Sequence, residues 1–190
     1  IDCRRVVFLS SISVYGPSEL PLAEGGPLPP ESAYGRSKFQ AEEIHRSWRK
    51  AVPGRKLVVM RPAVIFGTGE RGNFTRMAAL LRRRLFFYPG RSDTIKSCCY
   101  VGALVRSLTF VCGLERDEIT YNLAYPQRYS TKDICNAFCE VAGFPVPTLT
   151  MPLSLMLLGG FLFEVLGAIG ISTSVNRGRV LKLVKSTNIV

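Results

Sequence analysis

Short apolar runs alternate with stretches of helical spacing along most of the chain. Runs rich in β-branched and aromatic residues predict buried strands at 4–9, 56–60 and 119–124, with a shorter one at 85–88. Apolar positions three and four residues apart predict helices at 33–52, 74–85, 100–112 and between residues 130 and 143. Strands that alternate with helices in this way favour a parallel α/β sheet.

Turn and cap residues mark the limits of these elements. Pro53-Gly54 ends the first helix, because neither residue continues helical backbone easily. Ser130 and Asp133 have the spacing of a capping box, and Gly143 suits the position just past a helix. The Pro-, Gly- and Ser-rich stretch 16–31 predicts a loop between the first strand and the first helix.

Composition makes the chain globular and basic. Its 190 residues are 47% hydrophobic and 21% charged, which is enough to bury a sizeable core and excludes disorder and collagen-like repeats. The formal net charge is +11, so anionic partners such as nucleotides, nucleic acid or acidic lipid are compatible with it.

The sequence contains few residues that could form a metal site or a Ser-His-Asp catalytic triad. His45 is the only histidine, and the six cysteines form no CxxC pair and no zinc spacing. Cys135 and Cys139 lie one helical turn apart, which is more typical of a core stripe than of a ligand pair. This inventory leads us to expect no metal site. Because no signal peptide precedes Ile1, we also expect reduced thiols and a cytoplasmic location.

Tyr34 and Lys38 lie four residues apart on one face of the first predicted helix. An ammonium close to a phenol favours the phenolate, and a phenol tuned in this way acts as an acid or base near neutral pH. Taken alone, the pair is equally compatible with a surface tyrosine beside a solvated lysine.

Three motifs together resemble a known family. The first strand continues into Ser10-Ser11-Ile12-Ser13-Val14-Tyr15-Gly16, the helix begins with Tyr34-Gly35-Arg36-Ser37-Lys38, and the second strand ends in Arg61-Pro62-Ala63-Val64-Ile65-Phe66-Gly67. This set resembles the extended short-chain dehydrogenase/reductases, specifically their NAD-dependent nucleotide-sugar epimerases and dehydratases. The match covers nearly the whole chain.

The resemblance implies roles for four residues near a cofactor. Tyr34 matches the catalytic acid/base, and Lys38 matches its partner, which also binds the cofactor ribose. Ser11 matches the residue that hydrogen-bonds the substrate oxygen. Pro62 matches a residue beside the nicotinamide, although a proline there is also a plain strand terminator. NAD or NADP is the implied cofactor.

Two further residues are implied on the substrate side. Asn73 falls where relatives place an asparagine near the nucleotide diphosphate, and Lys96 falls where many have an arginine on a phosphate oxygen. Ordinary loop polarity explains both residues equally well. Val64 and Gly102-Ala103 depart from the family pattern, which leaves the substrate open.

The implied fold is the C-terminal part of a Rossmann-like doubly wound parallel sheet, plus a small, mostly helical substrate-binding lobe. We expect the cofactor-binding part at 1–67 and 96–125 and the lobe at 68–95 and 126–190. A GxGxxG sequence at 67–72 mimics the dinucleotide fingerprint. It follows the Tyr34 helix rather than the first strand, so we assign it to a turn and expect the true fingerprint in a preceding part that this chain lacks.

Two segments bear on membranes and nucleic acid. Residues 153–171 contain one charge, Glu164, and reach the length of a membrane span. That carboxylate and four glycines favour a buried or membrane-skimming helix over a spanning one, so membrane association stays possible. Arg82-Arg83-Arg84 ends a predicted helix, where cations favour the dipole, and we expect no nucleic-acid binding.

The sequence therefore predicts an NAD(P)-dependent nucleotide-sugar epimerase, dehydratase or 4-ketoreductase, dimeric when intact. It would act by proton transfer through Tyr34 and hydride transfer to and from the nicotinamide. Two alternatives stay open: a hydroxysteroid-dehydrogenase-like enzyme acting on an apolar alcohol, favoured by Val64 and 153–171, and a non-catalytic basic binding module. We expect the 190 residues alone to be inactive and to bind NAD poorly.

Overall fold

The structure is a computed structural model that describes residues 3–168 and 177–190. Two compact units make up the chain. Unit 1 comprises Ile1–Glu70, Ser97–Arg128 and Thr187–Val190, and unit 2 comprises Arg71–Lys96 and Tyr129–Ser186.

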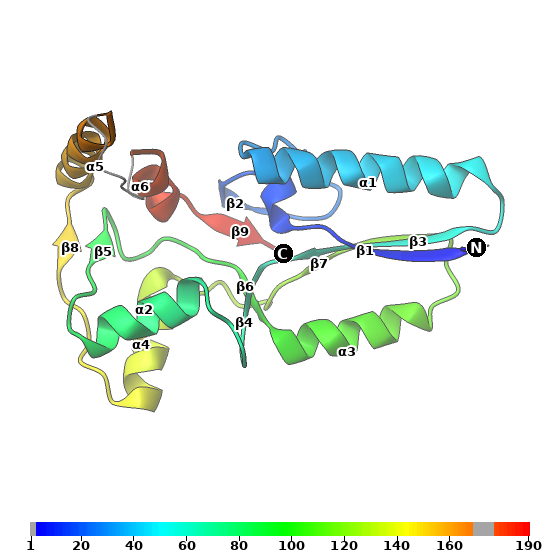
Figure 1. The fold of residues 1–190 in the computed structure, drawn as a ribbon. Helices are drawn as coiled ribbons and strands as arrows, with labels where there is room; N and C mark the ends of the chain where they lie inside the picture. Colours follow the sequence, from blue (N-terminus) through cyan, green and yellow to red (C-terminus); the bar gives the residue numbers. More distant parts are fainter. Residues whose placement is uncertain (1–2, 169–176) are drawn as a thin grey trace. The chain divides into compact units, whose positions relative to one another are not determined.

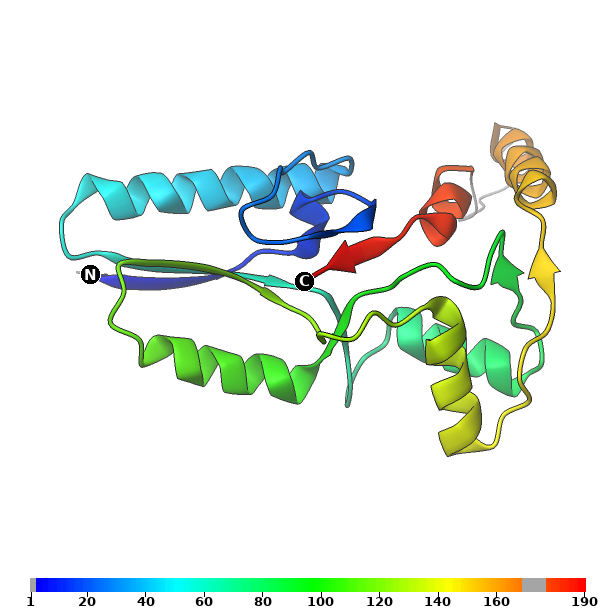
Figure 2. The same ribbon diagram turned by 180° about the vertical axis from the view of Figure 1, so that it is seen from behind.

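Unit 1 is built on a parallel sheet in the order β1-β3-β7. Its strands are β1 (Arg5–Leu9), β3 (Lys56–Pro62) and β7 (Glu118–Leu123), with Leu9 opposite Met60 in β3. Helix α1 (Ala33–Ala51) connects β1 to β3, and α3 (Val101–Cys112) leads into β7. Figures 1 and 2 show α1 and α3 on opposite faces of the sheet, so the doubly wound α/β fold is confirmed.

The central strand explains why this sheet forms. Residues 57–62 of β3 are all buried, because strands lie on both of its edges and helices cover both of its faces. Helix α1 begins at the Ser32 side chain, which accepts a hydrogen bond from the Gly35 N–H, and it ends just before Pro53-Gly54 as predicted.

Two small sheets in unit 1 are absent from the sequence prediction. The stretch 16–31, predicted as a loop, contains β2 (Ser18–Leu22), which pairs in parallel with β9 (Thr187–Ile189). Strands β4 (Val64–Phe66) and β6 (Cys98–Tyr100) form a second parallel pair. Each pair joins segments that are far apart in the sequence, so no local pattern could have indicated it.

The core of unit 1 lies beneath the loops that follow β1. A 3₁₀ turn, η1 (Ile12–Val14), directs two side chains into it, and the fully buried Tyr15 follows. Ala63 and Ile189 complete the buried cluster. This packing fixes the chain between the end of β1 and the start of α1.

Unit 2 contains four helices within its described residues: α2 (Asn73–Arg82), α4 (Thr131–Ala142), α5 (Leu153–Ala168) and α6 (Arg177–Val184). A short parallel pair, β5 (Tyr88–Pro89) with β8 (Thr150–Met151), replaces the strand predicted at 85–88. The predicted helix 74–85 was too long at its C-terminal end, because Arg84 has a left-handed φ of 60°.

The core of unit 2 confirms the reading of the cysteine pair. Cys135 and Cys139 are buried on α4 against Leu81 and Tyr88. Ser130 and Asp133 form the predicted capping box, and Gly143 ends α4 in the left-handed conformation. No helix among the described residues is long and apolar enough to cross a membrane, and residues 169–171 of the predicted apolar segment lie outside the described part.

Candidate active site

A cavity of about 320 Å³ opens in unit 1, where the carboxyl ends of β1 and β3 meet the first turns of α1. Ligands of open α/β sheets bind at this end of the strands. Four of the residues singled out in the sequence line it. The full lining is Leu9, Ser10, Ser11, Tyr34, Lys38, Pro62, Ala63 and Ile65.

Tyr34 and Lys38 face this cavity from one side of α1. The Tyr34 side chain is 56% exposed, so its phenol is accessible to a ligand. The Lys38 Nζ donates a hydrogen bond of 2.8 Å to the Leu9 carbonyl and lies 5.8 Å from the centroid of the Tyr34 ring. The end of β1 therefore anchors the ammonium close to the phenol.

Ser11 has a structural bond as well as a place in the cavity wall. Its Oγ accepts a hydrogen bond of 3.2 Å from the Ser13 N–H, which caps η1, and it lies 3.2 Å from the Ser13 Oγ. The cap fixes the position of the Ser11 hydroxyl at the end of β1. Ser11 therefore both caps η1 and lines the cavity.

Gly35 sets how closely α1 approaches η1, a role that the sequence analysis missed. A Cβ built on Gly35 would lie less than 3.0 Å from the Ser13 carbonyl oxygen, closer than real side chains come. Tyr34 and Ser11 flank this contact in the sequence. A glycine in the first turn of a good helix was the signal, because glycine weakens a helix unless close packing requires it.

A buried ion pair lies beneath the cavity and was also missed. The Arg61 guanidinium donates two hydrogen bonds to the Glu42 carboxylate, 2.9 Å from Nε and 2.7 Å from a terminal nitrogen. Ser10, which lines the cavity, donates a bond of 2.5 Å to the same carboxylate. Burial alone would raise the pKa of the Glu42 carboxyl, but the bonds from Arg61 and Ser10 outweigh it and hold that pKa below its ordinary value.

The network continues from β3 to β7. Arg61 also donates 2.7 Å to the Tyr15 hydroxyl, which in turn donates 2.8 Å to the Asn122 side-chain oxygen. Burial raises the pKa of Tyr15, so it stays a neutral donor. Residues from α1, β3, β7 and the loop after β1 are thus joined through the Arg61 guanidinium. The sequence signal for this network was Arg61, a charged residue near the end of an otherwise apolar strand.

The two predicted substrate-side residues belong to unit 2 and are not in the lining of this cavity. Asn73 is the exposed first residue of α2. The Lys96 Nζ donates 2.7 Å to the Lys185 carbonyl and 3.4 Å to the Lys182 carbonyl, so it holds the C-terminal end of α6.

The GxGxxG sequence forms a turn after the short strand β4. Gly67 has a φ of 133° and packs against the side chains of Tyr100 and Val101, so its lack of a side chain serves local packing. Across the residues that the structure describes, no group of three metal-binding side chains occurs.

Comparisons with known proteins identify the family of the chain. The model of the NAD dependent epimerase/dehydratase family matches residues 1–124. The chain is 31% identical, over 97% of its length, to N-acetyl-alpha-D-glucosaminyl-diphospho-ditrans,octacis-undecaprenol 4-epimerase of Escherichia coli O157:H7, of which it covers 56%. It is 28% identical, over 79% of its length, to UDP-glucose 4-epimerase 4 of Oryza sativa subsp. japonica, of which it covers 47%.

Solved structures share the fold. MoeE5 in complex with UDP-glucose and NAD matches 78% of this chain with a TM-score of 0.68 and 23% identity, over 51% of its own chain. UDP-glucose 4-epimerase from Bifidobacterium longum, in complex with NAD+ and UDP, gives a TM-score of 0.64 at 24% identity, over 78% of this chain and 52% of its own. The chain thus spans about half the length of these relatives. Since the family model matches well over half of it, the chain belongs to the NAD-dependent epimerase/dehydratase family.

Proposed function

We propose that the protein is an NAD-dependent 4-epimerase acting on a sugar that is carried on a diphosphate. The observation that carries this proposal is the convergence of Ser11, Tyr34 and Lys38 on one cavity at the carboxyl ends of the strands. The names of the two curated relatives support it, since both are 4-epimerases of sugars on a diphosphate carrier.

The cavity has the two kinds of wall that a nicotinamide nucleoside needs. Ser11, Tyr34 and Lys38 supply hydrogen-bonding groups, whereas Pro62 and Ala63 supply an apolar surface for a planar ring. We assign Lys38 and Tyr34 to the ribose and Pro62 to the ring. NAD is the proposed cofactor because the similar structures hold NAD.

The chain's own residues would carry the proton. The Tyr34 phenolate takes the proton of the sugar 4-hydroxyl while C4 gives up its hydride. The phenol returns that proton after the 4-keto sugar has rotated to present its opposite face. The Ser11 hydroxyl holds the reacting oxygen, and the Lys38 ammonium keeps a positive charge beside the phenolate. When bound, the nicotinamide supplies a hydride acceptor that then gives the hydride back.

Unit 2 is the proposed substrate-binding part. Asn73 and Lys96 are proposed to contact the diphosphate, as amide and ammonium donors suit phosphate oxygens. A diphosphate would compete with the carbonyls of Lys182 and Lys185 for the Lys96 ammonium.

The test is turnover of defined sugars by the full-length protein in deuterated water with NAD. UDP-glucose, UDP-N-acetylglucosamine and N-acetylglucosaminyl diphosphofarnesol are each incubated and analysed by NMR. An epimerase interconverts the 4-epimers, forms no net NADH and places no deuterium at C4, because the same hydride returns. Loss of water from the sugar, or net formation of NADH, would overturn the proposal in favour of a dehydratase or a dehydrogenase.

A further inference from the structure

Helix α5 presents an apolar stripe on its outer side. Leu155, Leu158, Phe161 and Leu162 are 46–55% exposed and fall within about 120° of the helix circumference at 100° per residue. Single exposed leucines are ordinary, but a continuous apolar stripe of large side chains marks an interaction surface. We call these four residues the α5 stripe.

The inner side of α5 is already occupied. Gly160 is buried, and a Cβ there would lie 3.1 Å from the backbone nitrogen of Arg177, so α6 packs closely against it. Leu155, Leu158 and Leu162 therefore lie on the side of α5 that α6 leaves open, whereas the Phe161 ring at the border of the stripe lies 5.4 Å from the Arg177 guanidinium. In Figure 1, α5 lies beside α6 within unit 2.

The single charge on α5 does not oppose an apolar environment. The Glu164 carboxylate accepts 2.9 Å from the Arg177 N–H and 2.8 Å from the Arg177 Nε, so it caps the start of α6 and pairs with a cation. The carboxylate that argued against a membrane span thus points to α6, and the paired Arg177 guanidinium borders the stripe only at Phe161.

The unit that bears the stripe also bears most of the net positive charge. Unit 2 contains 12 Lys and Arg residues against 4 Asp and Glu residues, so it accounts for +8 of the chain's +11. An apolar helix face on a strongly basic body is the pattern of proteins that bind anionic membrane surfaces.

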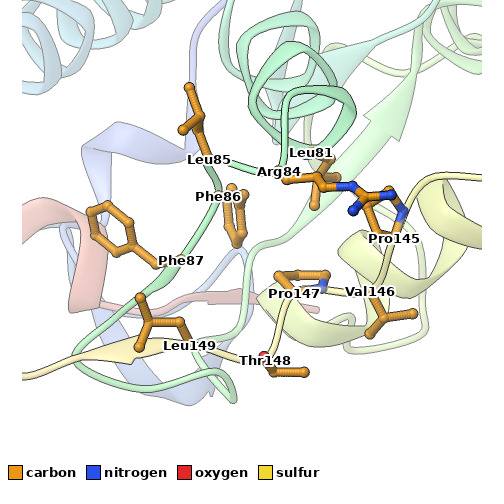
Figure 3. A pocket seen from close by; sticks show the side chains of 10 residues that line it. All are labelled: Leu81, Arg84, Leu85, Phe86, Phe87, Pro145, Val146, Pro147, Thr148 and Leu149. Carbon is orange, nitrogen blue, oxygen red and sulfur yellow. The ribbon is translucent and has the colours of Figure 1, made fainter.

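A second cavity in the same unit is shaped for an amphiphile. It measures about 520 Å³, and Leu85, Phe86, Phe87, Val146 and Leu149 give it apolar walls, with the Arg84 side chain at its margin (Figure 3). Leu149 stands four residues before α5 begins at Leu153, so their backbones lie at most about 14 Å apart. An isoprenoid chain fits such walls, and a phosphate fits the guanidinium.

We propose that unit 2 docks on an anionic lipid bilayer through the α5 stripe, and that the diphosphate-linked sugar it takes there is carried on an isoprenoid lipid. The second part rests on the proposed function and names its substrate class. Of the two curated relatives, the one that matches 97% of this chain carries an undecaprenol substrate in its name. The stripe supplies insertion between acyl chains, and the basic unit supplies attraction to anionic headgroups.

The first test is co-sedimentation of the full-length protein with vesicles made of equal parts of phosphatidylcholine and phosphatidylglycerol. The stripe variant Leu158→Gln/Leu162→Gln should partition about tenfold or more weakly than wild type, because each of these exposed apolar side chains contributes strongly to insertion. The matched control is Val105→Gln/Phe110→Gln, which removes exposed apolar side chains from α3 in unit 1. It should bind vesicles as wild type does.

Three outcomes would overturn the docking. Wild type could fail to sediment with anionic vesicles, the stripe variant could bind as wild type does, or the control could lose binding equally. If the stripe variant instead converts a dimer to a monomer, without any vesicle binding by wild type, the stripe is a contact between copies of the chain. Circular dichroism checks that the variants fold.

Tryptophan fluorescence provides a second test, which does not require a variant with weakened vesicle binding. In Leu158→Trp, tryptophan emission should shift to the blue when anionic vesicles are added, whereas Phe110→Trp should not shift, both against the constant signal of Trp48. Equal behaviour of the two variants would contradict insertion of the stripe.

Failure of the docking and failure of the proposed function are separable. Tyr34→Phe should bind vesicles normally while losing turnover, and the stripe variant should still turn over UDP-sugars if it turns over any. Vesicle binding without turnover of any sugar diphosphate would remove the proposed function and leave the membrane surface in place. Turnover of UDP-sugars but not of N-acetylglucosaminyl diphosphofarnesol would remove the isoprenoid carrier.

Discussion

Gly35 and Ser13 are in direct contact across the start of α1. The α-carbon of Gly35 faces the Ser13 carbonyl oxygen so closely that no Cβ fits between them. Tyr34 precedes this glycine, and Ser11 caps the turn that contains Ser13. The contact therefore sets the separation of the phenol and the hydroxyl that are proposed to share a substrate oxygen.

Gly35→Ala should separate these two groups. Relief of the overlap moves α1 away from η1, which we expect to cost about 1–3 kcal/mol of stability. A displacement of about 1 Å in a reacting group lowers turnover by up to about 100-fold. Urea unfolding and steady-state kinetics measure the two effects.

Gly159→Ala is the matched control for that substitution. Gly159 also lies inside a helix, but nothing lies within 4 Å of a Cβ there, so alanine should stabilise the protein by about 0.5–1 kcal/mol and leave turnover unchanged. Unchanged turnover in Gly35→Ala would show that the Gly35 contact does not position Tyr34.

Tyr34→Phe should remove the proton carrier and little else. We expect kcat to fall by about 10²–10⁴-fold, whereas the Kd for NAD should rise much less because Lys38 keeps its proposed contact with the ribose; the fold should persist because the Tyr34 side chain is 56% exposed. Tyr121→Phe is the control, since its hydroxyl contacts Ser107 and lies outside the cavity lining. More than half of the wild-type rate in Tyr34→Phe would exclude Tyr34 as the acid/base.

Glu42→Gln should lower the free energy of unfolding, because it leaves the buried Arg61 without its carboxylate partner. Removing one partner of a buried ion pair typically costs about 3–5 kcal/mol, because the other charge stays buried. Glu43→Gln is the control. Its carboxylate is 56% exposed, and its partner Arg46 keeps bonds to Glu42 and Glu118, so a change within about 0.5 kcal/mol is expected.

The same pair sets a pH dependence. The pKa of Glu42 in the folded protein lies below its ordinary value of 4.5. The stability that the ionised carboxylate contributes is therefore fully present above about pH 4.5 and is lost as the pH falls through the folded-state pKa. The difference in stability between wild type and Glu42→Gln should therefore be constant from about pH 6 to 7 and shrink below about pH 4.5. Thermal unfolding across this range measures it. A difference that grows toward acid would contradict a lowered pKa.

Local sequence patterns predicted the main strands and the first helix of unit 1. The apolar runs of β1, β3 and β7 and the spacing of α1 are local patterns, and they predicted a parallel α/β sheet without its strand order, β1-β3-β7. The pairing of β2 with β9 was not predictable, because Ser18–Leu22 has no apolar run and its partner lies at the other end of the chain. Helical spacing paired Tyr34 with Lys38, and the family resemblance added Ser11; all three line one cavity.

The buried network was harder to predict because charged residues usually indicate solvent. Glu42 lies on a helix with many polar positions, and its burial depends on bonds from Arg46 on the same helix, from Ser10 after β1 and from Arg61 on β3. The sequence indicates each residue separately, whereas their pairing depends on how α1 packs on the sheet. The same reason applies to Glu164, whose partner Arg177 begins the next helix.

Arg84 occupies a backbone position that favours glycine. Helix α2 ends in a Schellman motif, in which the Arg84 N–H bonds to the Leu81 carbonyl and the Leu85 N–H bonds to the Leu80 carbonyl. The residue between the helix end and Leu85 must then be left-handed, and Arg84 has a φ of 60°, the only such non-glycine among the described residues. An arginine there costs about 1–2 kcal/mol of backbone strain. Backbone strain of this kind is often retained at binding sites, so we expect the Arg84 side chain to bind a ligand at the second cavity.

Arg84→Gly should therefore make the protein more stable and its second cavity a poorer binding site. Stability should rise by about 1 kcal/mol in urea unfolding, because glycine adopts this φ freely. Binding of farnesyl diphosphate should weaken by about 10- to 100-fold in calorimetric titration, because a charge-assisted bond to phosphate contributes about 1.5–3 kcal/mol. Arg83→Gly is the control: Arg83 is right-handed, with a φ of −84°, so glycine should not stabilise there, and Arg83 is not in the cavity lining. If Arg84→Gly is more stable but binds farnesyl diphosphate as wild type does, the guanidinium does not hold the phosphate.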